Sequence, residues 1–277
     1  MSPLIIMLLL ASAVIHAAWN ALVKSGQDRL WSIAVISLFG AIAALPFAIG
    51  LQPPAAASLP YIAFSSGLQI GYCLFLVRAY DHGDLAQVYP IARGSAPLLV
   101  TVGAALFAGE LPGTYGLAGI ALVSLGIFAL AIGNHRADTQ SLLSALAAGA
   151  FIASYMVVDG LGVRLAGSAA GYAAWQAVVA GFLIPLTFIA IRRRRPVMPR
   201  GREGVMIVVA GILSTLAYCI AIWAMSESPL GGVSALRETS ILFAALLGVV
   251  ALREAITFRK IAGAVLVTAG VVYLSWT

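Results

Sequence analysis

The sequence predicts an all-α integral membrane protein, with ten transmembrane helices arranged as two inverted five-helix repeats around a central cavity. The chain is 62% hydrophobic and only 9% charged, whereas soluble domains are about 25% charged. Its apolar runs are about 20 residues long, the length that crosses a hydrocarbon core about 30 Å thick as a helix. These runs are continuous rather than alternating, which excludes a transmembrane β-barrel. A repeat within the sequence completes the prediction.

Ten apolar runs define the predicted spans. The first run continues to Val23 without a basic start, which favours a retained helix over a cleaved secretory signal. The connections are short and leave no room for a separate soluble domain. In chain order the spans are 4–23, 31–50, 59–79, 87–108, 114–133, 142–161, 170–191, 204–225, 231–252 and 258–276.

The second half of the chain repeats the first at an offset of 144 positions. Arg93 matches Arg237 and Glu110 matches Glu254, in a chain with only 16 Lys and Arg and 10 Asp and Glu. The repeat predicts two units, residues 1–136 and 137–277. Each contains five spans, an odd number, so the second unit enters the membrane from the opposite side. Inverted repeats are typical of secondary transporters that carry a site near the bilayer midplane.

Basic residues predict the orientation. Thirteen Lys and Arg residues lie in the odd-numbered connections and only Arg164 in the even-numbered ones. Because positive loops stay cytoplasmic, both termini are expected outside. The densest cluster comprises Arg192 to Arg195 with Arg200 and Arg202. It lies in a short connection between two spans, where basic residues bind anionic lipid headgroups, so the basic balance does not indicate nucleic-acid binding.

Three stretches carry a family resemblance. The first span contains His16-Ala-Ala-Trp-Asn20-Ala-Leu-Val-Lys24, and the fourth and ninth spans are followed by Glu110 or Glu254 and then by a glycine-rich helix. Over essentially its whole length the chain resembles the EamA family of the drug/metabolite transporter superfamily. The resemblance implies a basket of helices around a cavity, and metabolite export or exchange across a bacterial inner membrane. Members are commonly drawn with cytoplasmic termini, the reverse of the charge-based prediction.

Two arginines are the leading candidates for the cavity. An ionisable side chain within a span is costly unless it faces a wet cavity or a partner. Arg93 and Arg237 lie about 9 Å deep at ~1.5 Å per residue, one from each side. A guanidinium suits carboxylate or phosphate, which predicts an anionic or zwitterionic substrate. The alternative is structural pairing with Glu238, Asp159 or backbone carbonyls. Tyr89 and two prolines near Arg93 predict a kinked helix that lines a cavity.

Glu238 follows Arg237 directly, so the two side chains point about 100° apart on a helix and do not pair. Glu238 is expected to face Arg93 or His16 across the cavity. A buried carboxylate can exchange a proton when its surroundings change, so Glu238 is also the candidate coupling site, with protons as the coupling ion.

Further polar and aromatic residues complete the predicted site. His16, Trp19 and Asn20 share one face of the first span; hydrogen bonding between helices is the alternative role. Asp159 is expected at a span boundary, reaching headgroups, and Glu110 and Glu254 are read as helix-end signals. Aromatic and amide side chains inside spans either line the cavity or form interfacial belts: Tyr72, Tyr80, Tyr155, Trp175, Gln176, Tyr218 and Trp223.

The predicted function is a secondary transporter, an exporter or exchanger of small polar metabolites working by alternating access. No catalytic triad, phosphate loop or metal site is visible, so the sequence predicts neither an enzyme nor a cofactor. A flippase for a lipid-linked substrate is the alternative if the cavity opens sideways into lipid, and a membrane-embedded enzyme is less favoured. The expected partners are a metabolite, the bilayer and protons, with no nucleic acid and no assigned oligomeric state.

Overall fold

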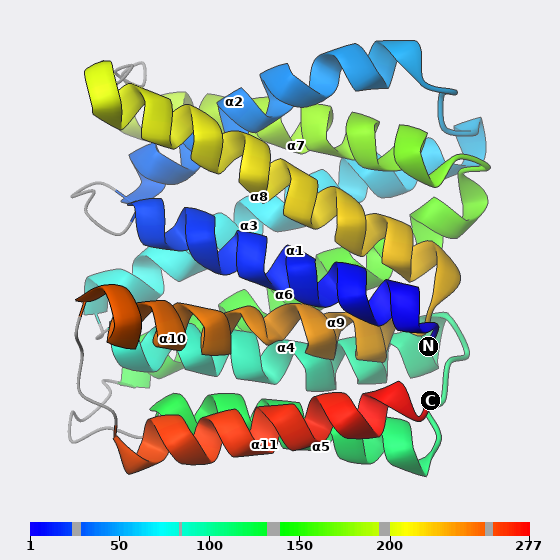
Figure 1. Ribbon diagram of the computed structural model, residues 1–277. Helices are drawn as coiled ribbons and strands as arrows, with labels where there is room; N and C mark the ends of the chain where they lie inside the picture. The colour runs from blue at the N-terminus through cyan, green and yellow to red at the C-terminus, as the bar shows by residue number, and fades with distance from the viewer. Residues whose placement is uncertain (24–28, 83–84, 132–138, 194–199, 253–256) are drawn as a thin grey trace.

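The chain forms an all-helical bundle in which successive helices run back and forth between two ends (Figure 1). This computed structural model describes residues 1–23, 29–82, 85–131, 139–193, 200–252 and 257–277. A short 3-10 turn, Ala56–Ser58, precedes the third helix. The α-helices are α1 (Pro3–Val23), α2 (Arg29–Gly50), α3 (Leu59–His82), α4 (Leu85–Phe107), α5 (Thr114–Ala131), α6 (Thr139–Leu165), α7 (Ala169–Arg192), α8 (Gly201–Glu227), α9 (Leu230–Glu238), α10 (Ser240–Leu252) and α11 (Phe258–Ser275).

Most of these helices are long and apolar enough to cross a membrane. Nine such stretches occur among the described residues, and Leu230–Leu247, which joins α9 to α10, is one of them. The apolar part of α1, Pro3–Trp19, is shorter than these nine. The chain is therefore an integral membrane protein of many helices, while a tenth span through α1 stays a prediction.

The predicted ninth span, 231–252, is not one continuous helix. It is interrupted at Thr239, which separates α9 from α10. The Thr239 hydroxyl donates to the carbonyl of Leu236 at 2.6 Å, a local bond that competes with regular helical pairing. By contrast, α4 is helical through both Pro90 and Pro97. Pro97 has no N–H to donate to the carbonyl of Arg93, four residues earlier.

Large apolar side chains cover the outside of the bundle. Phe47, Leu106 and Val250 are 63%, 73% and 71% exposed, a pattern that water would penalise and lipid tolerates. The largest buried cluster contains residues of every α-helix except α2. In Figure 1, α4, α6 and α9 lie between the pair α2 and α7 on one side and the pair α5 and α11 on the other.

Two pairs of glycines let α5 and α11 approach closely. A Cβ on Gly119 would lie 2.9 Å from the carbonyl oxygen of Gly270, and a Cβ on Gly126 would lie 2.9 Å from that of Gly263. In sequence, Gly119 and Gly263, like Gly126 and Gly270, are 144 positions apart. Each glycine therefore contacts the counterpart of the other. Such backbone contact is a common way for helices to associate in lipid, where small residues increase packing.

Replacing Gly126 by leucine is expected to destabilise the protein by about 2–3 kcal/mol, because the added atoms collide with the α11 backbone and must push the helices apart. Gly67→Leu is the matched control, since a Cβ at Gly67 meets nothing within 4 Å. Reversible unfolding in mixed detergent micelles, followed by circular dichroism, measures both variants. Equal stability of the two would contradict the backbone contact.

Candidate functional site

A buried ion pair joins α4 to α9 at the centre of the bundle. The Arg93 guanidinium donates from Nη1 to both carboxylate oxygens of Glu238, at 3.0 Å and 3.1 Å. Arg93 is 5% exposed and Glu238 is completely buried. The expectation that Glu238 faces Arg93 rather than its neighbour Arg237 is confirmed. For Arg93, the structure therefore supports the pairing role.

His16 extends this pair to α1. Its Nε2 lies 2.7 Å from Arg93 Nη2, and its Nδ1 lies 3.3 Å from the indole Nε1 of Trp19. Guanidinium and indole are both obligate donors, whereas a neutral imidazole has one acceptor nitrogen, so the two contacts compete for it. The charged and shorter contact with Arg93 is the stronger. His16 and Trp19 are thus part of this cluster through hydrogen bonds, and the Asn20 side chain lies outside the described residues.

Arg237 is buried without a comparable partner. It is 6% exposed, and its guanidinium carbon lies 4.6 Å from the centre of the Tyr218 ring. Its Nε and Nη1 have no hydrogen-bond partner, and no carboxylate within the described ranges is at ion-pair distance. The two arginines of the repeat therefore differ: one is neutralised by a carboxylate, and the other contacts the side chains of Tyr218 and Tyr155 while its Nε and Nη1 lack a partner.

Asp159 corrects the sequence-based prediction. It is completely buried, not at a boundary, and accepts hydrogen bonds from the hydroxyls of Tyr172, at 2.9 Å, and Tyr218. The predicted span ended at 161, but α6 continues to Leu165, which moves Asp159 away from the helix end. Tyr172 on α7 and Tyr218 on α8 then cover it.

Aromatic rings connect these groups. Tyr155 lies edge-to-face between Tyr72 and Tyr218, with ring centres 6.1 Å and 6.0 Å apart. Tyr89 lies 5.2 Å from the Arg93 guanidinium carbon. These four tyrosines therefore lie around the charged cluster and do not form an aromatic belt at the membrane interface. Trp175 packs against the same central core from α7.

Glu110 serves a helix end, in line with its predicted role. It accepts the backbone N–H of Leu230 at 2.8 Å, at the start of α9, and forms an ion pair with Arg164. Arg164 also donates to the carbonyls of Met225 and Ser228, each at 3.0 Å. These bonds tie the ends of α4, α6 and α8 together. Glu110 also caps the start of α9, whose own N-cap residue makes no side-chain hydrogen bond. Glu254 lies outside the described residues.

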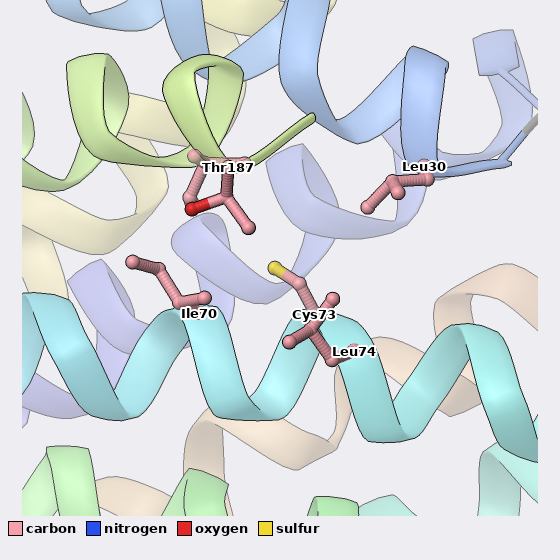
Figure 2. A pocket seen from close by; sticks show the side chains of 6 residues that line it. Leu30, Ile70, Cys73, Leu74 and Thr187 are labelled. Carbon is pink, nitrogen blue, oxygen red and sulfur yellow. The ribbon is translucent and has the colours of Figure 1, made fainter. Parts of the chain in front are cut away.

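A second hollow, between α2, α3 and α7, lacks such chemistry. Figure 2 shows its lining by Leu30, Ile70, Cys73, Leu74 and Thr187, and Ile184 completes it. It has no room for a water molecule, and the Thr187 hydroxyl donates to the Leu183 carbonyl in its own helix. Within the described part of the chain, no three His, Cys, Asp or Glu side chains are grouped to hold a metal. The charged central cluster is therefore the candidate site.

Sequence reasoning missed Asp159 and its partner Tyr172 as members of the cluster. A signal was present: Gly160 and Gly162 follow Asp159. A Cβ on Gly162 would lie 2.5 Å from the Tyr172 hydroxyl, and one on Gly160 would collide with Leu230. Small residues next to an acid within an apolar run indicate neighbouring helices that come close enough to cover it.

The fold and this buried centre define a polytopic helical membrane protein with charged side chains in its interior. The model of the EamA-like transporter family matches residues 139–276. The chain belongs to this family, part of the drug/metabolite transporter superfamily, whose members are transporters rather than enzymes.

One solved structure, titled only "Crystal structure of protein", shares the fold, with a TM-score of 0.77 and 18% identity over 99% of this chain and 96% of the other. None of the curated proteins matches this sequence.

Removing one partner of the central ion pair is expected to cost about 3–5 kcal/mol, because the other charge stays buried and unpaired. Arg93→Met and Glu238→Gln are compared with the double variant in a double-mutant cycle of unfolding in detergent. The double variant should lose less stability than the sum of the single losses. Glu227→Gln, at an exposed position on α8, is the control. Strict additivity would contradict the pairing.

Proposed function

We propose that the protein is a secondary transporter, an exporter or exchanger of small polar metabolites that works by alternating access around the Arg93–Arg237 centre. One observation carries the proposal most: Arg237 is a buried cation that lacks a hydrogen-bond partner at two nitrogens. An ionisable group deep in a membrane protein is costly, so its presence favours a function in binding or transport. The site residues proposed for this function are His16, Trp19, Asn20, Tyr89, Arg93, Tyr155, Trp175, Tyr218, Arg237 and Glu238.

We further propose ten spans in two inverted repeats, 1–136 and 137–277. The reciprocal glycine contacts support this arrangement, because a two-fold axis exchanges two equivalent surfaces in this way. Both chain termini lie at one end of the bundle, while α7 ends and α8 begins, with Arg192, Arg200 and Arg202, at the other (Figure 1). The positive-inside rule then favours termini outside the cell, in a bacterial inner membrane.

Alternating access also assigns a role to the helix-end contacts. Glu110 belongs to the first proposed repeat, and Arg164 and Leu230 belong to the second. Their contacts hold the repeats together at the end that carries the termini. Opening toward that side requires these contacts to separate, so they act as a closure between the two halves.

Proton coupling follows from the same ion pair. Both carboxylate oxygens of Glu238 accept from Arg93, so the charge of Glu238 is matched only while α4 and α9 stay together. A movement that separates α4 from α9 therefore releases Glu238 for protonation. This link makes Glu238 the proposed coupling residue.

The flippase alternative gains less support. A groove of about 350 Å³ lies between α2 and α8, lined by Phe39, Gly201, Gly204, Val205, Val208 and Val209. None of the charged residues of the central cluster lines it. A lipid-linked substrate in this groove would therefore lie apart from the ionisable centre.

A thermal-shift screen of purified protein against amino acids, organic acids and phosphonates supplies a substrate for flux measurements in liposomes. The wild type is expected to respond to an imposed pH gradient. Glu238→Gln should lose that response yet still exchange substrate without a gradient, because it has no proton site; Glu227→Gln should behave as wild type. Full proton dependence in Glu238→Gln would refute the coupling role, and no flux of any bound ligand would refute transport.

A further inference from the structure

The central site can be assigned a more specific ligand, on the basis of the proposed transport function. We infer that it binds a small organic carboxylate that has no ammonium group, with Arg237 as the ligand's charge partner. Of the anionic and zwitterionic substrates compatible with two arginines, the geometry points to the anion.

The first argument is the kind of polar atom that lacks a partner. The buried side-chain nitrogens without one are all donors: Gln69 Nε2, Arg93 Nε, Trp175 Nε1, Gln176 Nε2, and Arg237 Nε and Nη1. The other such atoms in the described ranges are serine hydroxyls, which can donate or accept. Within the described ranges, no buried carboxylate or amide oxygen lacks a hydrogen-bond partner. Because buried polar groups are almost always satisfied, the centre requires an acceptor.

These donors come from several helices of the bundle. Arg93 and Arg237 come from α4 and α9, and Trp175 and Gln176 from α7. Gln176 lies one turn beyond Tyr172 and on the same face of α7. Tyr172 and Tyr218 both donate to Asp159. The Tyr218 ring in turn contacts the guanidinium of Arg237. The arginine and indole donors cannot become acceptors by rotation, unlike a glutamine side chain, so the requirement for an acceptor does not depend on amide orientation.

The second argument is that both acidic groups are already occupied. Glu238 accepts from Arg93 with both oxygens, and each oxygen of Asp159 accepts from a tyrosine hydroxyl. An ammonium group would have to share these oxygens with the donors already bound there. A ligand carboxylate oxygen that accepts from Nε or Nη1 of Arg237 shares no acceptor, since neither nitrogen has a partner.

The repeat explains why this position lacks a protein carboxylate. At the offset of 144, the counterpart of Arg93 is Arg237, but the counterpart of Glu238 is Gly94. The second half thus supplies a carboxylate to the first half's arginine, and the first half supplies none in return. A ligand carboxylate would provide the missing charge.

The shape of the site selects the rest of the ligand. The Tyr218 ring centre lies 4.6 Å from the Arg237 guanidinium carbon, and Nε and Nη1 have no partner, so a carboxylate oxygen can accept from either nitrogen. Tyr155 and Tyr72 continue from Tyr218 as an edge-to-face row of rings. This row suits an apolar or aromatic body attached to the carboxylate.

Matched ligand sets test the inference on the full-length wild-type protein in detergent. Each set has one carbon skeleton as carboxylate, zwitterion, amine and phosphonate, for example 3-phenylpropionate, phenylalanine, phenethylamine and 2-phenylethylphosphonate, with short aliphatic sets alongside. Affinity is measured by calorimetry. We expect carboxylates to bind at least tenfold more tightly than their zwitterions, and the amines not to bind. Equal or tighter binding of zwitterion, amine or phosphonate, or no binding by any carboxylate, overturns the assignment.

Variants locate the charge partner. Arg237→Gln should weaken carboxylate binding at least tenfold, and Arg237→Lys, which keeps the charge if the glutamine variant does not fold, should weaken it less. Arg202→Gln, at an exposed position, should bind as wild type. Unchanged affinity in both Arg237 variants overturns the assignment. Liposome flux separates the two proposals: a transported zwitterion contradicts only the ligand class, and a bound carboxylate that is never transported contradicts only the transport function.

Discussion

The buried ion pair between Arg93 and Glu238 is the constraint on which the rest of the centre depends. Burying a charge in a membrane protein is costly, and a partner of opposite charge at hydrogen-bond distance offsets much of that cost; this pair has its two members in different halves of the chain. It fixes the separation of α4 and α9 and commits both oxygens of the carboxylate. It also places a donor against His16, which can accept that bond only while neutral. Arg237 does not pair with Glu238, because the side chains of adjacent helical residues point about 100° apart.

The close packing of the helices keeps water from screening these charges. On one side of the bundle, glycines bring the backbones of α5 and α11 into contact. On the other, Gly162 lets Tyr172 approach Asp159, and the phenol hydroxyls replace the water that a carboxylate needs. Gly162 thus serves the electrostatics: a larger side chain there would push Tyr172 away and leave Asp159 with one hydrogen-bond donor fewer.

Features that depend on local sequence pattern were predictable, whereas burial by side chains from other helices was not. Continuous apolar runs located the membrane helices, because crossing lipid demands length and little else. The pairing of Arg93 with Glu238 was predictable, since adjacent helical residues diverge by about 100° and a buried carboxylate needs a cation. The burial of Asp159 was not, because it depends on Tyr172 and Tyr218 from two other helices. The break at Thr239 was also missed, because a threonine in a helix can equally bond within a regular turn.

The difference between the two arginines bears on how a duplicated protein can carry a ligand. If both halves had kept an arginine followed by a glutamate, each arginine could be neutralised by the other half and no charge would remain for a ligand. Gly94 in the place that corresponds to Glu238 removes one of the two carboxylates. One arginine then holds the halves together, and the other has unoccupied donors. A ligand that binds Arg237 does so without breaking the ion pair between α4 and α9. Binding and closure can therefore coexist, as an occluded state of a transporter requires.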